Sequence, residues 1–301
     1  MNESSRRIPA LVTLDVHDEP EMDRYFDRAV QMLAEMGIPA TYFVPAQVFR
    51  KYPKRIAGIP MSHQIACHGL FHDGQEVYDL MASEMQREYI RRATEILSDG
   101  LGRHPGAFRS PGFRISGTTL CMLQECGYYA DVSVNSGRLE VTSTRKKETR
   151  WFLAPRVPYH PDPRDPFRRG NLSLWEIPVS AFVLPFTSNA AVVLGACLTK
   201  LFAALLYQEC RVRHKPMVYM SHPEDLCENG PERKRSRFNL KLLLPRDGGF
   251  PIRHYLSCKN AKEFYRINRA VLEHLQQLAY LEFLTVEAYV RQHLSPSAVK
   301  S

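Results

Sequence analysis

The segment that decides the fold spans residues 9–44 and reads PALVTLDVHDEPEMDRYFDRAVQMLAEMGIPATYFV. Residues 9–15 form a short apolar run rich in β-forming side chains, which indicates a buried strand. Apolar residues then recur at helical spacing over 22–36, and Gly37 is placed to end that helix as a C-cap. A second strand is predicted at 40–44. Strand, helix and strand in this order form a βαβ unit, whose two strands pair in parallel.

The same alternation continues along the rest of the chain. Strands are expected at 64–67, 107–109, 174–179 and 216–220, helices at 81–97, 118–125, 189–208 and 261–278, and a terminal element at 282–294. This order predicts an α/β fold with parallel strands, either a barrel or a doubly wound sheet. Polar clusters follow the predicted carboxyl ends of four strands, where sites assemble in such folds, and this favours a distorted (β/α) barrel.

Composition narrows the class of protein. The chain has 301 residues, of which 44% are hydrophobic and 24% charged, and a net charge of +8. These values are typical of a folded soluble protein, and the positive charge favours anionic partners. The basic runs are short and lack interleaved aromatic residues, so no nucleic-acid partner is expected.

Cysteine usage and the start of the chain bear on its location. The seven cysteines form an odd, scattered set without CxxC pairs, which is typical of a reducing compartment. The first twenty residues contain no apolar run of the length of a signal peptide. We therefore expect a cytoplasmic protein.

An uncharged stretch lies between Ile177 and Thr199. Its prolines and polar residues predict a buried strand, a turn and then an apolar helix over 189–208. Two alternatives stay open for that helix: it packs in the core, or it makes peripheral contact with an anionic membrane surface.

Two pairs of polar residues follow predicted strands at close spacing. A spacing of four, as between His68 and His72, places two imidazoles on one face of a helical turn, close enough to share a metal. Asp15 and His17 are two residues apart at a strand end, so both side chains face the same way. One of them can bind a metal while the other stays free as a base. The alternative for this second pair is a polar loop that caps the next helix.

Arg109 and His222 complete the set of candidate catalytic residues. Arg109 ends one predicted strand and His222 follows another, so a guanidinium and an imidazole join the same edge of the sheet. Singly, either residue can be structural. Together with the two pairs they provide what a hydrolytic site requires: metal ligands, a carboxylate base, and a histidine that protonates the leaving amine.

Five motifs carry a resemblance to a known family. They are TLDVHD (13–18), HQIACHGLFH (63–72), FRSPGFR (108–114), LWEIPVS (174–180) and MSHPE (220–224). In this order they resemble the motifs of the polysaccharide deacetylase family, also called the NodB-homology domain or carbohydrate esterase family 4. The resemblance covers about residues 8–290. It implies a single domain at 8–294 with the distorted barrel of that family, flanked by tails at 1–7 and 295–301.

The resemblance also implies roles for the catalytic residues and the metal ligands. Asp15 corresponds to the catalytic base, Arg109 to the residue that orients it and keeps it ionised, and His222 to the general acid. His17, His68 and His72 correspond to the ligands of a divalent metal. The family usually has an aspartate where His17 stands, and Asp18 is the alternative third ligand. The ligand types favour Zn²⁺, with Co²⁺, Ni²⁺, Fe²⁺ and Mn²⁺ as alternatives.

Three further residues correspond to the family's substrate-binding positions. The backbone N–H of Gly112, which stands where a tyrosine is common, corresponds to an oxyanion donor. Met220 corresponds to a residue that lines the acyl pocket, and Trp175 to one that walls the site.

The implied function is removal of an N-acetyl group from an N-acetylhexosamine-containing glycan or glycan precursor, such as a lipid-linked one. Two alternatives are kept. One is a deformylase or a hydrolase of another small amide, and the other is a non-catalytic protein that binds carbohydrate on the same fold.

Overall fold

The computed structural model describes residues 7–18, 21–137, 149–231, 238, 255 and 258–294. Its strands are β1 (Ile8–Asp15), β2 (Ala40–Val44), β3 (Gln64–Cys67), β4 (Ala107–Phe108), β5 (Ala130–Asp131), β6 (Trp175–Glu176), β7 (Ala181–Phe182), β8 (Leu184–Pro185), β9 (Met217–Ser221) and β10 (Leu281–Phe283). Its α-helices are α1 (Glu21–Arg24), α2 (Phe26–Glu35), α3 (Ala46–Lys51), α4 (Pro53–Ala57), α5 (Ser83–Leu101), α6 (Gly117–Glu125), α7 (Ser188–Arg213), α9 (Ala261–Gln277) and α10 (Val286–Tyr289).

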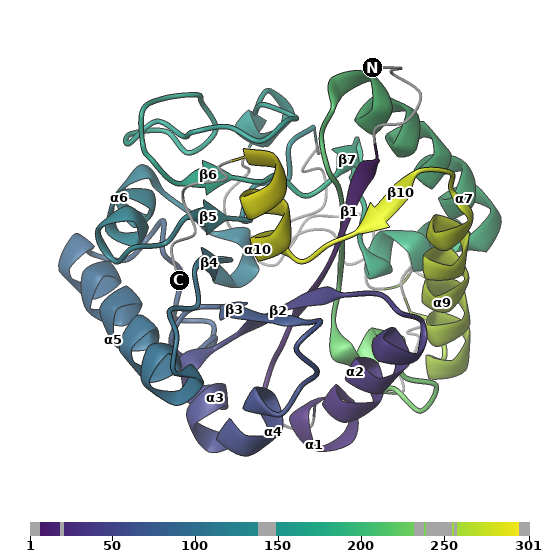
Figure 1. The fold of residues 1–301 in the computed structure, drawn as a ribbon, viewed down its shortest axis with the longest axis horizontal. Coiled ribbons are helices and arrows are strands. Elements are labelled where there is room, and N and C mark those ends of the chain that lie inside the picture. Colours follow the sequence, from purple (N-terminus) through teal and green to yellow (C-terminus); the bar gives the residue numbers. More distant parts are fainter. Residues whose placement is uncertain are drawn as a thin grey trace.

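Eight parallel strands form one curved sheet. From β1 the order runs through β2, β3, β4 and β5 to β6. On the other side of β1 lies β9, and the first residues of β1 pair with β10. Past β6, the N–H of Ser180 donates to the carbonyl of Val218, and the N–H of Met220 in β9 donates to the carbonyl of Phe186. These bonds bring the chain back to β9 and close the ring of strands, which helices surround (Figure 1). The predicted distorted (β/α) barrel is confirmed.

Side chains alternate between the inside and the outside of the barrel. On β1, Leu11 belongs to an apolar cluster inside the barrel, whereas Val12 and Leu14 pack with the helices around it. Because side chains on a strand repeat their direction every two residues, Thr13 and Asp15 point to the same side as Leu11. On β1 the interior therefore changes from apolar at Leu11 to polar at Thr13 and Asp15, toward the carboxyl end of the strand.

The C-terminal segment closes the opposite end of the barrel. Val286 and Tyr289 of α10 and Val290 after it belong to the interior apolar cluster. The N–H of Val286 donates to Oγ1 of Thr41 on β2, and both are buried. Figure 1 shows α10 lying across the centre of the ring of strands.

Several predicted elements differ from those observed. The helix predicted over 22–36 is broken at Tyr25 into α1 and α2, and the strand predicted at 174–179 pairs regularly only over β6. The terminal element predicted at 282–294 divides into β10, α10 and a short π-helical segment, Val290–Leu294. Parts of the segments 137–171 and 227–258, most of the N-terminal tail and the whole C-terminal tail lie outside the described residues.

The helix predicted over 189–208 extends from Ser188 to Arg213 as α7. It is kinked at Gly195, whose φ of 76° is left-handed, and one face packs in the core through residues that include Ala203, Leu206 and Cys210. In the described part of the chain, it is the one helix long and apolar enough to cross a membrane, and a third of its most apolar stretch is buried (33%).

Candidate active site

The site lies at the carboxyl ends of the strands, and its side chains face inward because side-chain direction repeats every two residues along a strand. His68 lies two residues after Ala66, Arg109 two after Ala107, and His222 two after Met220. Ala66, Ala107 and Met220 all belong to the interior cluster, so the polar side chain beyond each is directed to the same end of the barrel.

Three histidines converge at this end. The ring of His72 lies 4.4 Å from that of His17 and 4.8 Å from that of His68, measured between centroids. One nitrogen from each of the three rings lies within 4.8 Å of the others. This is the trio that the sequence assigns as metal ligands.

The protonation of these histidines suits metal binding. Burial lowers the pKa of His68 to about 3 and that of His72 to about 4, and it also lowers the pKa of His17. All three rings are therefore neutral at pH 7, the form that binds a metal. Nδ1 of His68 lies 2.7 Å from the carbonyl oxygen of Arg109 and donates to it, which leaves the lone pair of Nε2 on the side of Asp15.

His72 reaches the trio through a loop, and the predicted helical turn between His68 and His72 is wrong. Gly69 has φ 81° and His72 has φ 58°, so the chain turns sharply through left-handed conformations. The carboxylate of Glu76 sits inside the turn and accepts the backbone N–H groups of Leu70, Phe71 and His72 at 2.7–2.8 Å. It also accepts the hydroxyl of Tyr78 at 2.6 Å.

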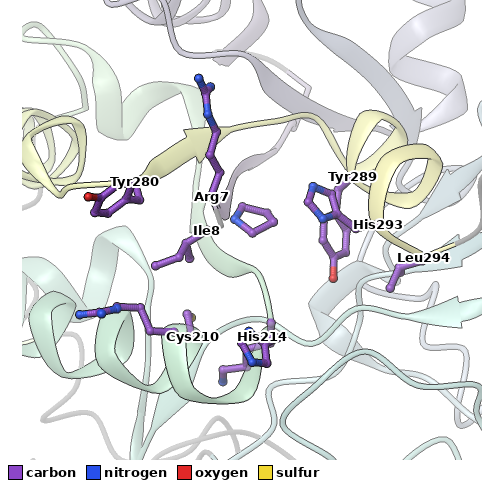
Figure 2. A pocket seen from close by; sticks show the side chains of 11 residues that line it. Arg7, Ile8, Cys210, His214, Tyr280, Tyr289, His293 and Leu294 are labelled. Carbon is purple, nitrogen blue, oxygen red and sulfur yellow. The ribbon is translucent and has the colours of Figure 1, made fainter. Parts of the chain in front are cut away.

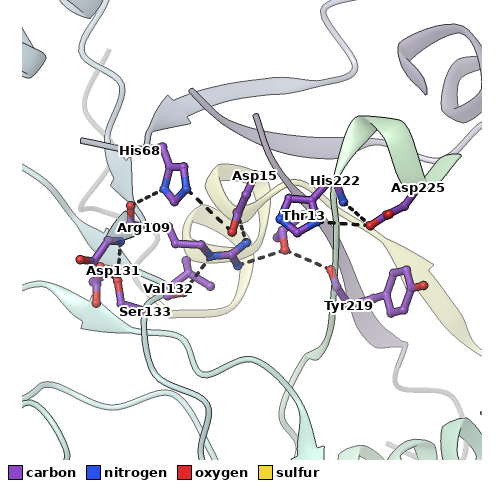
Figure 3. Close-up of polar contacts among 11 residues, drawn as sticks. Thr13, Asp15, His68, Arg109, Asp131, Val132, Ser133, Tyr219, His222 and Asp225 are labelled. Carbon is purple, nitrogen blue, oxygen red and sulfur yellow. Dashed lines mark hydrogen bonds and ion pairs between the residues drawn. The ribbon is translucent and has the colours of Figure 1, made fainter. Parts of the chain in front are cut away.

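Asp15 is held by Arg109. Nη1 of Arg109 donates to Oδ1 of Asp15 at 2.7 Å, while Nη2 donates to Oγ1 of Thr13 and Nε to the carbonyl of Val132, both at 3.0 Å (Figure 3). The guanidinium is fully buried and lies 4.3 Å from the ring centroid of Phe43. Burial raises the pKa of Asp15, but the positive charges around it, Arg109 first, lower the pKa to about 2. Asp15 is therefore ionised, and its Oδ2 lies 3.9 Å from Nε2 of His68.

His222 is paired with a carboxylate that the motif analysis did not identify. Its Nδ1 lies 3.2 Å from Oδ2 of the buried Asp225, which also accepts the hydroxyl of Ser188 at 2.6 Å. Burial opposes protonation of His222, but the hydrogen bond and charge of Asp225 raise its pKa to about 10. A protonated His222 thus stands 4.9 Å from the ring of His17, measured between centroids.

The alternative third ligand lies elsewhere. The carboxylate of Asp18 is half-exposed and forms an ion pair with Nζ of Lys51 at 3.2 Å. Among the described residues, Asp18 does not belong to a group placed to hold a cation, whereas His17 does.

The three expected substrate-binding residues occupy different positions. Gly112 has φ 60° in the turn that follows Arg109, a conformation that favours glycine, and Met220 lies in the barrel interior below His222. Trp175 is the first residue of β6, and its ring lies against that of His160, with centroids 3.8 Å apart and the planes tilted by 36°.

Comparison with known proteins agrees with this geometry. The model of the polysaccharide deacetylase family matches residues 5–130. Residues 5–130 belong to the polysaccharide deacetylase family. The matched segment of this polysaccharide deacetylase domain includes Asp15, the three histidines and Arg109, whereas His222 lies beyond it.

Individual relatives extend the likeness. The peptidoglycan deacetylase-like protein FGM2 of Gibberella zeae is 26% identical over an alignment of 174 residues. The alignment covers 53% of this chain and 47% of that protein, so it spans about half of the relative's length. The structure resembles that of a probable polysaccharide deacetylase of Pseudomonas aeruginosa PAO1, with a TM-score of 0.60, 14% identity and coverage of 96% of this chain and 93% of the other.

A second solved structure with the same fold is that of PuuE allantoinase. Its TM-score is 0.59 at 11% identity, with coverage of 95% of this chain and 92% of the other. At these identities the two structures establish the fold that the polysaccharide deacetylase domain adopts.

Proposed function

We propose that this protein is a metal-dependent hydrolase that removes an N-acetyl group from an N-acetylhexosamine unit of a glycan or glycan precursor. The observation that carries the proposal is the convergence of three neutral imidazoles beside a carboxylate that a buried arginine keeps ionised. The family of residues 5–130 supports the reaction class, hydrolysis of an amide by a deacetylase.

The residues fit a divalent metal. His17, His68 and His72 would hold it, since three neutral nitrogen donors leave a coordination position open, as in catalytic zinc sites. When bound, the metal supplies Lewis acidity, which polarises the acyl carbonyl and lowers the pKa of water.

Two side chains of the protein carry out the proton transfers, Asp15 as the base and His222 as the acid. Ionised Asp15 takes a proton from the attacking water as the oxygen of that water bonds to the acyl carbon. The backbone N–H of Gly112 stabilises the negative charge that develops on the carbonyl oxygen. Protonated His222 gives its proton to the amine nitrogen as the C–N bond breaks, and Asp225 holds its ring in position.

Substrates of a second class are kept as the alternative. The fold resembles that of an allantoinase as closely as that of a polysaccharide deacetylase, so a small formamide or cyclic amide is the rival substrate. A third alternative is a non-catalytic protein that binds carbohydrate.

A substrate panel with matched variants tests the proposal. Zinc-loaded protein is given N-acetylated chitin oligomers, an N-formylated sugar and a cyclic amide, and acetate, formate and ring opening are measured. We expect acetate release from the oligomers. Asp15→Asn should keep the metal and lower kcat by about 10²–10⁴-fold, the usual contribution of a general base.

Asp18→Asn is the control, because it neutralises a nearby carboxylate that lies outside the metal trio. Undiminished turnover in Asp15→Asn would contradict the assignment of the base. Formate release or ring opening without acetate release would favour the rival substrates, and metal binding without any turnover would favour the non-catalytic alternative.

A further inference from the structure

The outer face of α7 carries an exposed apolar stripe. Leu198, Leu201, Leu205 and Val212 are each more than half exposed. Their spacing of three, four and seven residues places them on one face of the helix. We call these four residues the α7 stripe. The helix packs against the core through its other face, so the stripe is a surface that folding has left uncovered among the described residues.

A second apolar feature lies beside it. The tip of the β7–β8 hairpin exposes three consecutive apolar side chains, Phe182, Val183 and Leu184. Val183 has φ 64°, a costly conformation for a β-branched residue. The guanidinium of Arg156 lies 5.8 Å from the ring centroid of Phe182 and also binds Glu209 of α7, which brings the tip next to the helix.

The charge around the stripe is positive. Glu209 lies one turn after Leu205 and is contacted by three cations, with nitrogen–oxygen distances of 2.6 Å to Arg156, 3.0 Å to Lys215 and 3.5 Å to Arg213. Three positive charges around one negative charge leave an excess of positive charge at this end of α7.

A cavity of about 110 Å³ adds to this excess beside the last turn of α7 (Figure 2). Arg7, Arg211, His214, Lys215 and His293 are among the residues that line it, and no acidic residue is among them. Lys215 is already paired with Glu209, and Arg7 forms an ion pair with Glu282 at 3.3 Å, so the added positive charge comes from Arg211. A cavity of this charge suits the phosphate of a lipid headgroup.

We propose that the α7 stripe and the β7–β8 tip rest on an anionic lipid bilayer, and that the cations at the end of α7 contact lipid phosphates. An apolar face flanked by cations is the arrangement by which a helix lies in the interface of a bilayer. Because the opposite face of α7 packs on the core, the helix lies on the membrane and does not span it. This inference concerns binding and does not depend on the proposed activity.

Vesicle sedimentation tests the inference directly. The full chain is mixed with phosphatidylcholine vesicles that contain or lack phosphatidylglycerol. We expect sedimentation with the anionic vesicles and little with the neutral ones. Binding should weaken as the salt rises to about 1 M, where charges are screened over roughly 3 Å.

Two variants separate the apolar and the electrostatic parts. The triple change Leu198→Ser, Leu201→Ser and Leu205→Ser should weaken binding about tenfold or more, because it removes the apolar side chains that would enter the bilayer. Its control is Met61→Ser with Met85→Ser, two exposed apolar residues outside α7, in the turn before β3 and in α5. Arg211→Glu should also weaken binding, whereas Lys54→Glu on α4 should not. Circular dichroism and zinc content verify that each variant is folded.

Three results would overturn the inference. They are wild-type protein that stays in the supernatant with anionic vesicles at low salt, a triple variant that binds as well as wild type, and wild-type protein that is a dimer in solution while the triple variant is a monomer. The last result would assign the stripe to a second copy of the chain.

Discussion

At the scale of single residues, the account depends on how Arg109 is held. Its guanidinium donates to Asp15, Thr13 and the carbonyl of Val132, so it connects β1 with the end of β5 inside the barrel. A charge that is buried this completely is stable only while its partners remain, because loss of one partner leaves the other unpaired. The same contact keeps Asp15 ionised beside the histidines.

Asp225→Asn should move the alkaline limb of the pH profile of kcat. His222 acts as an acid in its protonated form, so activity falls as the pH rises through its pKa, which Asp225 raises from 6.5 to about 10. Without the carboxylate the pKa falls, and the limb should move to lower pH. The measurement is kcat on the best acetylated substrate from neutral to alkaline pH.

Ser188→Ala is the matched control, because it removes a hydrogen bond to Asp225 but no charge. An alkaline limb that stays in place in Asp225→Asn would show that His222 is not the acid. The raised pKa also stabilises the folded state below pH 6.5, and this stabilisation is lost as the pH rises through about 10.

Residues that act through a motif could be predicted from the sequence, whereas their supporting residues could not. Asp15, Arg109 and the three histidines lie at the end of a strand or shortly after it, so a local pattern locates them. Asp225 and Ser188 meet across 37 positions of sequence, and a contact of that kind depends on the fold. Glu76 is closer in sequence to the groups it supports, since it accepts the N–H groups of a loop that ends four residues before it. Nothing in the sequence showed that this loop turns so tightly.

At the scale of elements, the loop after β3 shows why spacing alone misled. Four residues separate His68 from His72, which fits a helical turn, yet Gly69 takes a left-handed conformation directly after the strand. A buried carboxylate inside the turn replaces the hydrogen bonds that a helix would make. The two rings therefore meet as expected, but for a different reason.

Gly69→Ala should disrupt this loop more than Gly74→Ala. Both glycines have φ near 80°, so both substitutions carry similar backbone strain, but only at Gly69 would the new Cβ lie 2.5 Å from Oε1 of Glu76. We expect Gly69→Ala to lower the free energy of unfolding by about 1–3 kcal/mol more than Gly74→Ala, the usual cost of overpacking. Chemical denaturation measures this difference, and zinc titration should show weaker binding in Gly69→Ala. Equal effects of the two changes would mean that Glu76 does not need its present position.

Two predicted helices agree closely with the observed ones. The helix predicted over 261–278 is observed as α9 (Ala261–Gln277), and the one over 118–125 as α6 with a capping box at Ser116. Strands β4, β5 and β6 are two residues long, so their sequences contain too little alternation to fix their bounds.

At the scale of the whole molecule, the barrel separates stability from chemistry. Apolar side chains fill its interior, α10 closes one end, and the candidate site occupies the other (Figure 1). The order of strands and helices in the sequence predicted this architecture, because parallel strands require helical crossovers. The closure of the ring between Ser180, Phe186 and β9 could not be predicted, since it joins segments without a regular pattern.

Leu11→Ala should therefore destabilise the protein without altering the site. Leu11 is buried inside the barrel, and removal of a buried leucine side chain costs about 2–5 kcal/mol of unfolding free energy. The protein that remains folded should bind zinc with unchanged affinity, because Leu11 lies four residues from Asp15 along β1. Leu153→Ala, at an exposed leucine, is the control. A large loss of zinc affinity in Leu11→Ala would show that interior and site are coupled.

The central claim is that His17, His68 and His72 bind one cation together. Equilibrium dialysis against zinc, followed by elemental analysis, measures the metal held per chain in wild type, in an alanine variant of each histidine and in Asp18→Ala. We predict one tightly bound ion per chain in wild type and in Asp18→Ala, and loss of that ion in each histidine variant. A histidine variant that retains the ion, or an Asp18→Ala protein that loses it, would contradict the claim.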